Sequence, residues 1–230
     1  MRTRVRSGVV QRAFCAWVLI GVTIPATARA DGEVWTWVEQ RLPLAGSSGA
    51  LPRVSLRLFT DVRMNGRSEG LAQAFLRAGP LVHLTPWMFV GVHGTIYADR
   101  LASGQFAQEA RAELEPNLFG RVGPLTFNDR NRLEYRWRAS GERWRYRNQL
   151  RVSYAPPGAR WIPFVWNEVL FDLSGEGFQQ NRAEVGLGRI LGDRSRIDVG
   201  YLFRSRHEGG QWHHDHILNV YLYLEPVPGW

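Results

Sequence analysis

The sequence of 230 residues contains no lysine, a single cysteine (Cys15) and no apolar run long enough for a transmembrane helix. One cysteine cannot form an intramolecular disulfide, so stability must come from a large core or a closed sheet. After residue 31, no helical stripe of apolar residues extends beyond about ten residues, which argues against a helical fold. All 29 basic residues are therefore arginine.

The net charge of +8 invites a nucleic-acid-binding interpretation. Residues 1–30 contain no acid and hold five of the arginines, namely Arg2, Arg4, Arg6, Arg12 and Arg29. Without this segment, 29 − 5 = 24 bases face 21 acids, a balance of +3. The remaining arginines alternate with carboxylates, so we expect no nucleic-acid partner.

Residues 1–30 have the three-part pattern of a cleaved secretory signal. A basic segment (1–12) precedes 12 uncharged, mostly apolar residues, and the small residues Ala28 and Ala30 mark a cleavage site. The apolar run is shorter than the about 20 residues that a membrane anchor needs. We therefore expect export and a mature chain that starts at Asp31, lacks cysteine and forms a single domain over residues 31–230.

The mature chain alternates apolar and polar residues through about eleven strand-like segments. In one of them, Leu133, Tyr135 and Trp137 alternate with arginines and an acid. Several segments have 12 to 15 residues, whereas strands of soluble proteins usually have about five or six. Turn-forming residues separate the segments, which are 33–42, 53–64, 70–84, 87–99, 105–118, 125–139, 143–154, 161–173, 178–190, 195–206 and 213–225.

These lengths predict an all-β fold, an antiparallel up-and-down transmembrane β-barrel, because about 9–11 residues cross a bilayer as a tilted strand. Bacterial barrels normally have an even number of strands. We therefore expect ten strands over 53–225, with 33–42 as an N-terminal addition, or twelve strands. Compact turns at alternate junctions predict tight turns on one side and longer loops on the other. Aromatic residues near strand ends fit interfacial belts, namely Trp87, Trp137, Trp144, Tyr154 and Trp161.

One face of the strands mixes arginine with acid. In a membrane barrel the apolar face meets lipid and the polar face lines the interior, so we predict Arg–carboxylate ladders that fill a narrow lumen. The planar guanidinium suits such pairing. The alternative is a soluble sheet whose charged face is solvated. The candidate ladder residues are Glu109, Arg111, Glu113, Arg130, Arg132, Glu134, Arg136, Arg138, Arg145, Arg147, Arg151, Glu168, Arg182, Glu184, Asp198 and Arg204.

The order of several segments resembles the DUF2490 family, a family of exported bacterial proteins of unknown function. The segments that carry the resemblance are VWTWVEQRLPL, EARAEL, RNRLEYRWR followed by RYRNQLRV, PFVWNEVLFDL, FQQNRAEVGLG, DVGYLFR and HILNVYLYL. The resemblance implies an outer-membrane β-barrel. It implies no activity, so no functional residue is carried over from it.

Other candidate sites are less specific. Residues 211–217 hold three histidines and Asp215, which are metal-ligand types, but consecutive strand residues face opposite sides, and a polar loop is the favoured interpretation. His83 and His93 have interior parity, as a lipid hydrolase would require, yet no serine lies in a G-x-S-x-G pattern. We predict no catalytic residue, cofactor or metal.

The sequence thus predicts a small barrel in the outer membrane of a Gram-negative bacterium, with a structural, adhesive or minor transport role. Its expected partners are outer-membrane lipids and, during biogenesis, the barrel-assembly machinery; any small-molecule ligand is unidentified. An outer-membrane enzyme that modifies lipid or lipopolysaccharide is one alternative. A soluble periplasmic barrel that binds a ligand is another.

Overall fold

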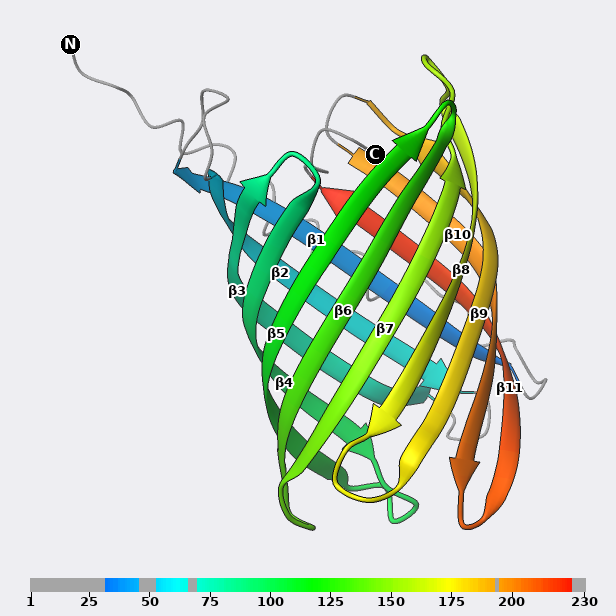
Figure 1. Ribbon diagram of the computed structural model, residues 1–230. Coiled ribbons are helices and arrows are strands. Elements are labelled where there is room, and N and C mark those ends of the chain that lie inside the picture. Colours follow the sequence, from blue (N-terminus) through cyan, green and yellow to red (C-terminus); the bar gives the residue numbers. More distant parts are fainter. Residues whose placement is uncertain (1–31, 46–52, 66–69, 193–194, 225–230) are drawn as a thin grey trace.

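The computed structural model describes residues 32–45, 53–65, 70–192 and 195–224 as one closed β-barrel (Figure 1). The signal segment, residues 1–30, lies outside these ranges, so its cleavage stays a prediction. Among the described residues, no helix has the length and apolar character to cross a membrane. The strands are β1 (Glu33–Ala45), β2 (Arg53–Asn65), β3 (Gly70–Thr85), β4 (Met88–Arg100), β5 (Phe106–Val122), β6 (Leu125–Arg138), β7 (Arg143–Tyr154), β8 (Trp161–Asp172), β9 (Gly177–Ile190), β10 (Ser195–Glu208) and β11 (Gln211–Leu224).

Each strand pairs antiparallel with the next along the chain, and β1 closes the barrel against β11. Because an odd number of strands leaves the first and last pointing the same way, the closing pair is parallel, running from Glu33–Ile217 to Gln40–Leu224. The prediction of an all-β barrel is confirmed. The expectation of ten or twelve strands is wrong, because residues 33–42 form part of a full barrel strand that pairs on both sides.

The described connections are short at both ends of the barrel. The upper end in Figure 1 carries 86–87, 123–124 and 155–160, and the lower end carries 101–105, 139–142, 173–176 and 209–210. The expected contrast between tight turns and longer loops is therefore not seen among these connections.

The β10–β11 connection is a two-residue turn. Gly209 (φ 58°) and Gly210 (φ 79°) both have positive φ, which a hairpin turn matched to the strand twist requires at its two central positions. Because the turn is so short, residues 211–217 lie within β11. The polar loop expected for that segment is therefore wrong.

The two faces of the barrel have inverted polarity compared with a soluble sheet. Side chains alternate between the faces. On β5, Glu113 and Glu115 are buried while Leu114 is 47 % exposed. The same alternation leaves large apolar side chains exposed along the other strands, among them Val62, Leu76, Val92, Ile96, Leu150, Val165, Val185 and Val199.

An aromatic core occupies part of the barrel interior, contributed by β1–β4, β8, β10 and β11. Trp37 of β1 lies near its centre, with its ring 5.1 Å from Phe59 and 4.9 Å from Tyr221 between centroids. Phe75 and Tyr97 stack at 4.4 Å on the β3–β4 side. The segment 33–42, including Trp35 and Trp37, therefore contributes both a wall strand and part of the filling.

Candidate functional site

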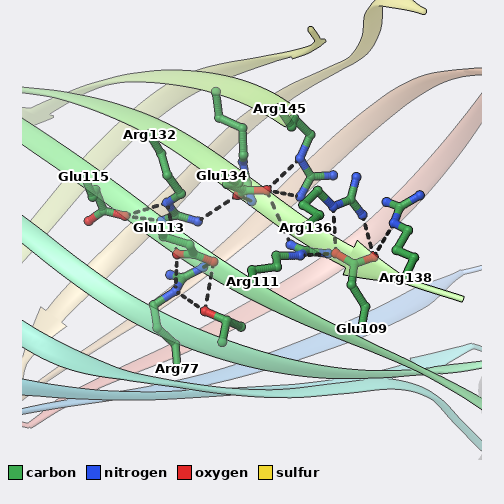
Figure 2. Close-up of polar contacts among 12 residues, drawn as sticks. Arg77, Glu109, Arg111, Glu113, Glu115, Arg132, Glu134, Arg136, Arg138 and Arg145 are labelled. Atoms are coloured by element: carbon green, nitrogen blue, oxygen red, sulfur yellow. Dashed lines mark hydrogen bonds and ion pairs between the residues drawn. The ribbon is translucent and has the colours of Figure 1, made fainter. Parts of the chain in front are cut away.

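The interior faces of β5–β9 carry a network of arginine–carboxylate pairs, part of which is drawn in Figure 2. The candidate ladder residues all have the interior parity of their strands, and most are buried. Ion pairs join them to one another and to acids on β1 and β11. Glu184 accepts hydrogen bonds from Asn219 (2.7 Å) and Tyr221 (3.2 Å). The half-buried members are Arg130, Arg138, Arg145 and Arg204.

Glu134 on β6 is shared by four arginines and is completely buried. Its carboxylate accepts hydrogen bonds from Arg145 Nε at 2.7 Å and from Arg147 Nη1 at 3.1 Å. The Nη1 atoms of Arg111 and Arg132 each lie 3.6 Å from a carboxylate oxygen of Glu134. Because charges interact strongly where water is excluded, this one carboxylate holds together arginines that would otherwise repel one another.

Glu109 on β5 has a similar role closer to the lower end of the barrel. Arg136 binds it with two bonds, Nε to Oε1 at 2.6 Å and Nη2 to Oε2 at 2.8 Å. Arg138 Nε donates to Oε2 at 2.6 Å, and Arg111 Nε donates to Oε1. Bidentate guanidinium–carboxylate pairs are among the strongest charge-assisted hydrogen bonds, so Glu109 fixes the positions of three guanidinium groups.

Glu115 on β5 extends the network across the barrel interior. Arg57 of β2 donates Nη1 to Glu115 Oε1 at 2.7 Å and Nη2 to Glu39 Oε2 of β1 at 2.6 Å. Arg132 Nε donates to the other oxygen of Glu115 at 2.6 Å. These bonds tie β1 and β2 to β5 and β6 through side chains alone, so the charge network crosses the interior as well as following the wall.

Two further acids extend the network to β8–β10. Glu168 of β8 accepts a hydrogen bond from Arg147 Nη2 at 2.7 Å and another from Arg182 Nη1 at 3.1 Å. Asp198 of β10 accepts a hydrogen bond from Arg151 Nη2 at 2.6 Å. Each arginine therefore reaches an acid on a different strand, and the network links the strands from β5 to β10.

Guanidinium groups also border the aromatic core. Arg63 lies over the Trp35 ring at 3.7 Å from its centroid, and Arg111 lies over Tyr97 at 3.5 Å. Cations placed over aromatic faces are attracted by the ring quadrupole, more so where they are desolvated. The charge network and the aromatic core thus form one continuous packing of the interior.

His93, Glu113 and Glu115 are the one group of described residues whose ligand atoms lie close enough together to hold a metal ion. Arginines already occupy these carboxylates: Arg77 Nε lies 2.8 Å from Glu113 Oε2, and Arg57 bonds Glu115. A divalent cation would have to displace these guanidinium groups and enter a region already rich in positive charge. The donor set therefore does not fit a metal.

The histidines proposed for a hydrolase both belong to the interior face. His93 is buried, and neither of its ring nitrogens has a hydrogen-bond partner among the described residues. The His83 ring packs 5.2 Å from the Phe89 ring. A serine nucleophile must hydrogen-bond its histidine base, so no such pair is assembled at His93.

The sequence profile described as "Protein of unknown function (DUF2490)" matches residues 33–214, from the first residue of β1 into the start of β11. The chain belongs to this family. An uncharacterised protein of Methylorubrum extorquens is similar as well, 26% identical over 228 residues that cover 90% of this chain and 93% of that protein. No solved structure matches the chain. The family match includes β1, the strand that closes the DUF2490 barrel.

The histidine-rich segment of this DUF2490 barrel is divided between the two faces of β11. Asp215 points inward and accepts hydrogen bonds from Arg204 Nε at 2.8 Å and Arg206 Nε at 3.0 Å. His214 and His216 lie on the outer face against Phe203, with ring centroids at 5.4 and 5.6 Å. These side chains therefore do not converge on one metal-binding point.

Aromatic side chains on the outer face lie toward the two ends of the DUF2490 barrel. Near the lower end, Tyr135 packs against Trp137 and Trp144, both at 4.7 Å between centroids. Near the upper end, Trp87 is 55% and Trp161 is 50% exposed. Exposed aromatic side chains therefore lie near both ends of the barrel wall, with exposed aliphatic side chains such as Ile96 and Val185 between them.

Several network residues were not among the sequence candidates. Arg57, Arg77 and Glu115 each bridge strands far apart in the sequence. Arg57 shares the polar face of its segment, and Glu115 follows Glu113 by two residues, so parity places both inside. Parity alone gives no sign that β2 and β5 face each other across the interior.

Proposed function

We propose that this DUF2490 barrel is an integral protein of a bacterial outer membrane, with a filled interior and a structural or ligand-binding role. The observation that carries the proposal is the inverted polarity of a closed barrel. An apolar outer face, flanked by aromatic residues, surrounds a charged interior, which is the arrangement of membrane barrels.

The strand lengths support a membrane-spanning barrel. The shortest described strands, β7 and β8, have 12 residues each. At about 3.3 Å per residue and a tilt of about 40°, such a strand rises about 30 Å. The outward apolar band of membrane barrels is about 25 Å tall, so even the shortest strands are long enough to cross it.

The exposed apolar face argues against a barrel dissolved in the periplasm. Ile96 is 64% exposed and Val185 is 57% exposed, on strands far apart in the wall. Soluble monomers rarely expose apolar patches above about 300–600 Å². An apolar outer face that surrounds the whole barrel is favourable when lipid covers it.

The filled interior argues against a wide diffusion pore. Trp35 and Leu202 of the aromatic core are completely buried, and so is Glu134 of the charge network. Small barrels have interiors that side chains can fill. Large solutes therefore have no open path at the level of these residues. A lipid-modifying enzyme has no specific observation in its favour, because His93 has no hydroxyl partner among the described residues.

Fractionation tests the proposal. Full-length protein is expressed in a Gram-negative host, and osmotic-shock, inner-membrane and outer-membrane fractions are separated alongside a marker for each. We expect the protein in the outer membrane, with an N-terminus at Asp31 and with faster gel mobility when unheated than when boiled. Recovery in the soluble periplasmic fraction with markers correctly placed would contradict the proposal.

A further inference from the structure

The lower end of the barrel contains an arginine-lined vestibule of about 680 Å³. Arg136 and Arg138 of β6 and Arg145 of β7 form one wall, and Arg206 of β10 lies in another. Its volume lies within the range of about 300–1,000 Å³ that is typical of small-ligand sites. The vestibule is therefore large enough for a ligand of the size of a sugar phosphate.

Cationic side chains outnumber anionic ones on the lining of the vestibule. Its lining has four arginines and two glutamates, Glu176 and Glu208, and acids behind the lining (Glu109, Glu134 and Asp215) offset part of the arginine charge. The two glutamate side chains are 56% and 58% exposed, whereas Arg145 is 11% exposed. The two acids of the lining thus lie at the solvated rim, where water screens them, and guanidinium groups form the deeper wall.

The arginines of this wall keep unused hydrogen-bond donors. Arg138 donates only from Nε, to Glu109, among the described residues. Arg145 binds the single carboxylate of Glu134. A guanidinium has five N–H donors, and Figure 2 shows several arginines gathered around each of these two carboxylates. Donors on the wall therefore exceed the acceptors that hold them.

We infer that the vestibule binds the phosphate group of an anionic ligand. A phosphate ester carries about −1.5 to −2 charge at neutral pH and three strong acceptor oxygens, which the spare guanidinium donors of Arg138 and Arg145 can bind. Guanidinium groups pair with phosphate oxygens in forked geometry. Glu109 and Glu134 hold the guanidinium groups in place before the ligand arrives, which lowers the cost of binding.

Calorimetric titration of the purified barrel in a non-ionic detergent tests this inference. The probes are inorganic phosphate and glycerol 3-phosphate, followed by phosphatidic acid in nanodiscs. Succinate, a dicarboxylate of similar charge, is the comparison that lacks a phosphate group. We expect saturable binding of phosphate probes that weakens with added salt. Binding only in the nanodisc arm assigns the phosphate to a lipid, and binding of the soluble probes assigns it to a free ester.

Matched variants locate the site. Arg138→Gln and Arg145→Gln should each weaken phosphate binding about tenfold or more, the loss expected for one charge-assisted hydrogen bond. Arg189→Gln is the control, because Arg189 is exposed and lies over Trp161 at the upper end. Glu208→Gln should strengthen binding by removing a rim acid, a gain that misfolding cannot produce.

Three results would overturn the inference: no phosphate probe binds, succinate binds as tightly as phosphate, or Arg189→Gln weakens binding as much as Arg138→Gln. The measurement is independent of the cell fraction that contains the protein. A failure here therefore leaves the membrane proposal standing, and a failure of fractionation leaves this binding test valid.

Discussion

Replacing Glu134 with glutamine tests the charge network most severely. The change keeps the size and shape of the side chain but removes the negative charge that lies within 3.6 Å of four guanidinium groups. Arg111 and Arg147 keep other acids, Glu109 and Glu168, whereas Arg145 pairs with Glu134 alone among the described residues. Leaving a buried charge without its partner costs about 3–5 kcal/mol. We expect Glu134→Gln to lower the free energy of unfolding by that amount.

The assay is urea unfolding of the barrel reconstituted in lipid vesicles, followed by tryptophan fluorescence and by the loss of heat-modifiable mobility. The control is Glu208→Gln, because Glu208 is 58% exposed and forms a surface pair with Arg206, which is worth about 0–1 kcal/mol. A second change, Arg145→Met, made together with Glu134→Gln should recover part of the loss. The reasoning is refuted if Glu134→Gln costs no more than Glu208→Gln, or if the double variant is less stable than the single one.

Three further predictions concern closure, the outer face and the core. In a Cys15→Ser background, the double change Thr36→Cys and Val220→Cys should form a disulfide on oxidation, because these residues are partners in the parallel β1–β11 pair. The disulfide is detected as a gel shift, and no cross-link would form if β1 lay outside the barrel. Val185→Arg, in the middle of β9, should lower the free energy of unfolding in lipid by about 2–4 kcal/mol, and Val122→Arg, at the end of β5, by about 0–1 kcal/mol. Equal losses for the two variants in urea unfolding would contradict a lipid-facing wall. Trp37→Ala should lower the unfolding free energy by about 3–5 kcal/mol in the same assay, and a loss below about 1 kcal/mol would show that the aromatic core is loosely packed.

Most of the wall could be predicted from the sequence, because it depends on local alternation. Period-two patterning located each strand to within a few residues and separated the interior face from the outer face. Glu134 and Trp137 illustrate this: three residues apart in one segment, they have opposite parity, and one is buried while the other is 42% exposed. Arginine alternating with acid likewise indicated pairing between neighbouring strands.

The closure of the barrel could not be predicted in this way. The β1–β11 pair joins residues 33–40 to 217–224, and nothing local in either segment specifies a parallel partner so far along the chain. The general preference for even strand numbers pointed in the wrong direction. Contacts across the interior, such as Arg57 with Glu115, are equally nonlocal, since parity states which side a residue faces but not what lies opposite.

The central claim is that lipid covers the outer face of this barrel, and spin labelling tests it most directly. A nitroxide on Val185→Cys, in a Cys15→Ser background reconstituted in vesicles, is compared with one on Ser140→Cys in the exposed β6–β7 connection. We predict that the label at 185 collides more with oxygen, which concentrates in lipid, and that the label at 140 collides more with a water-soluble nickel chelate. Greater accessibility of position 185 to the nickel chelate than to oxygen would contradict the account.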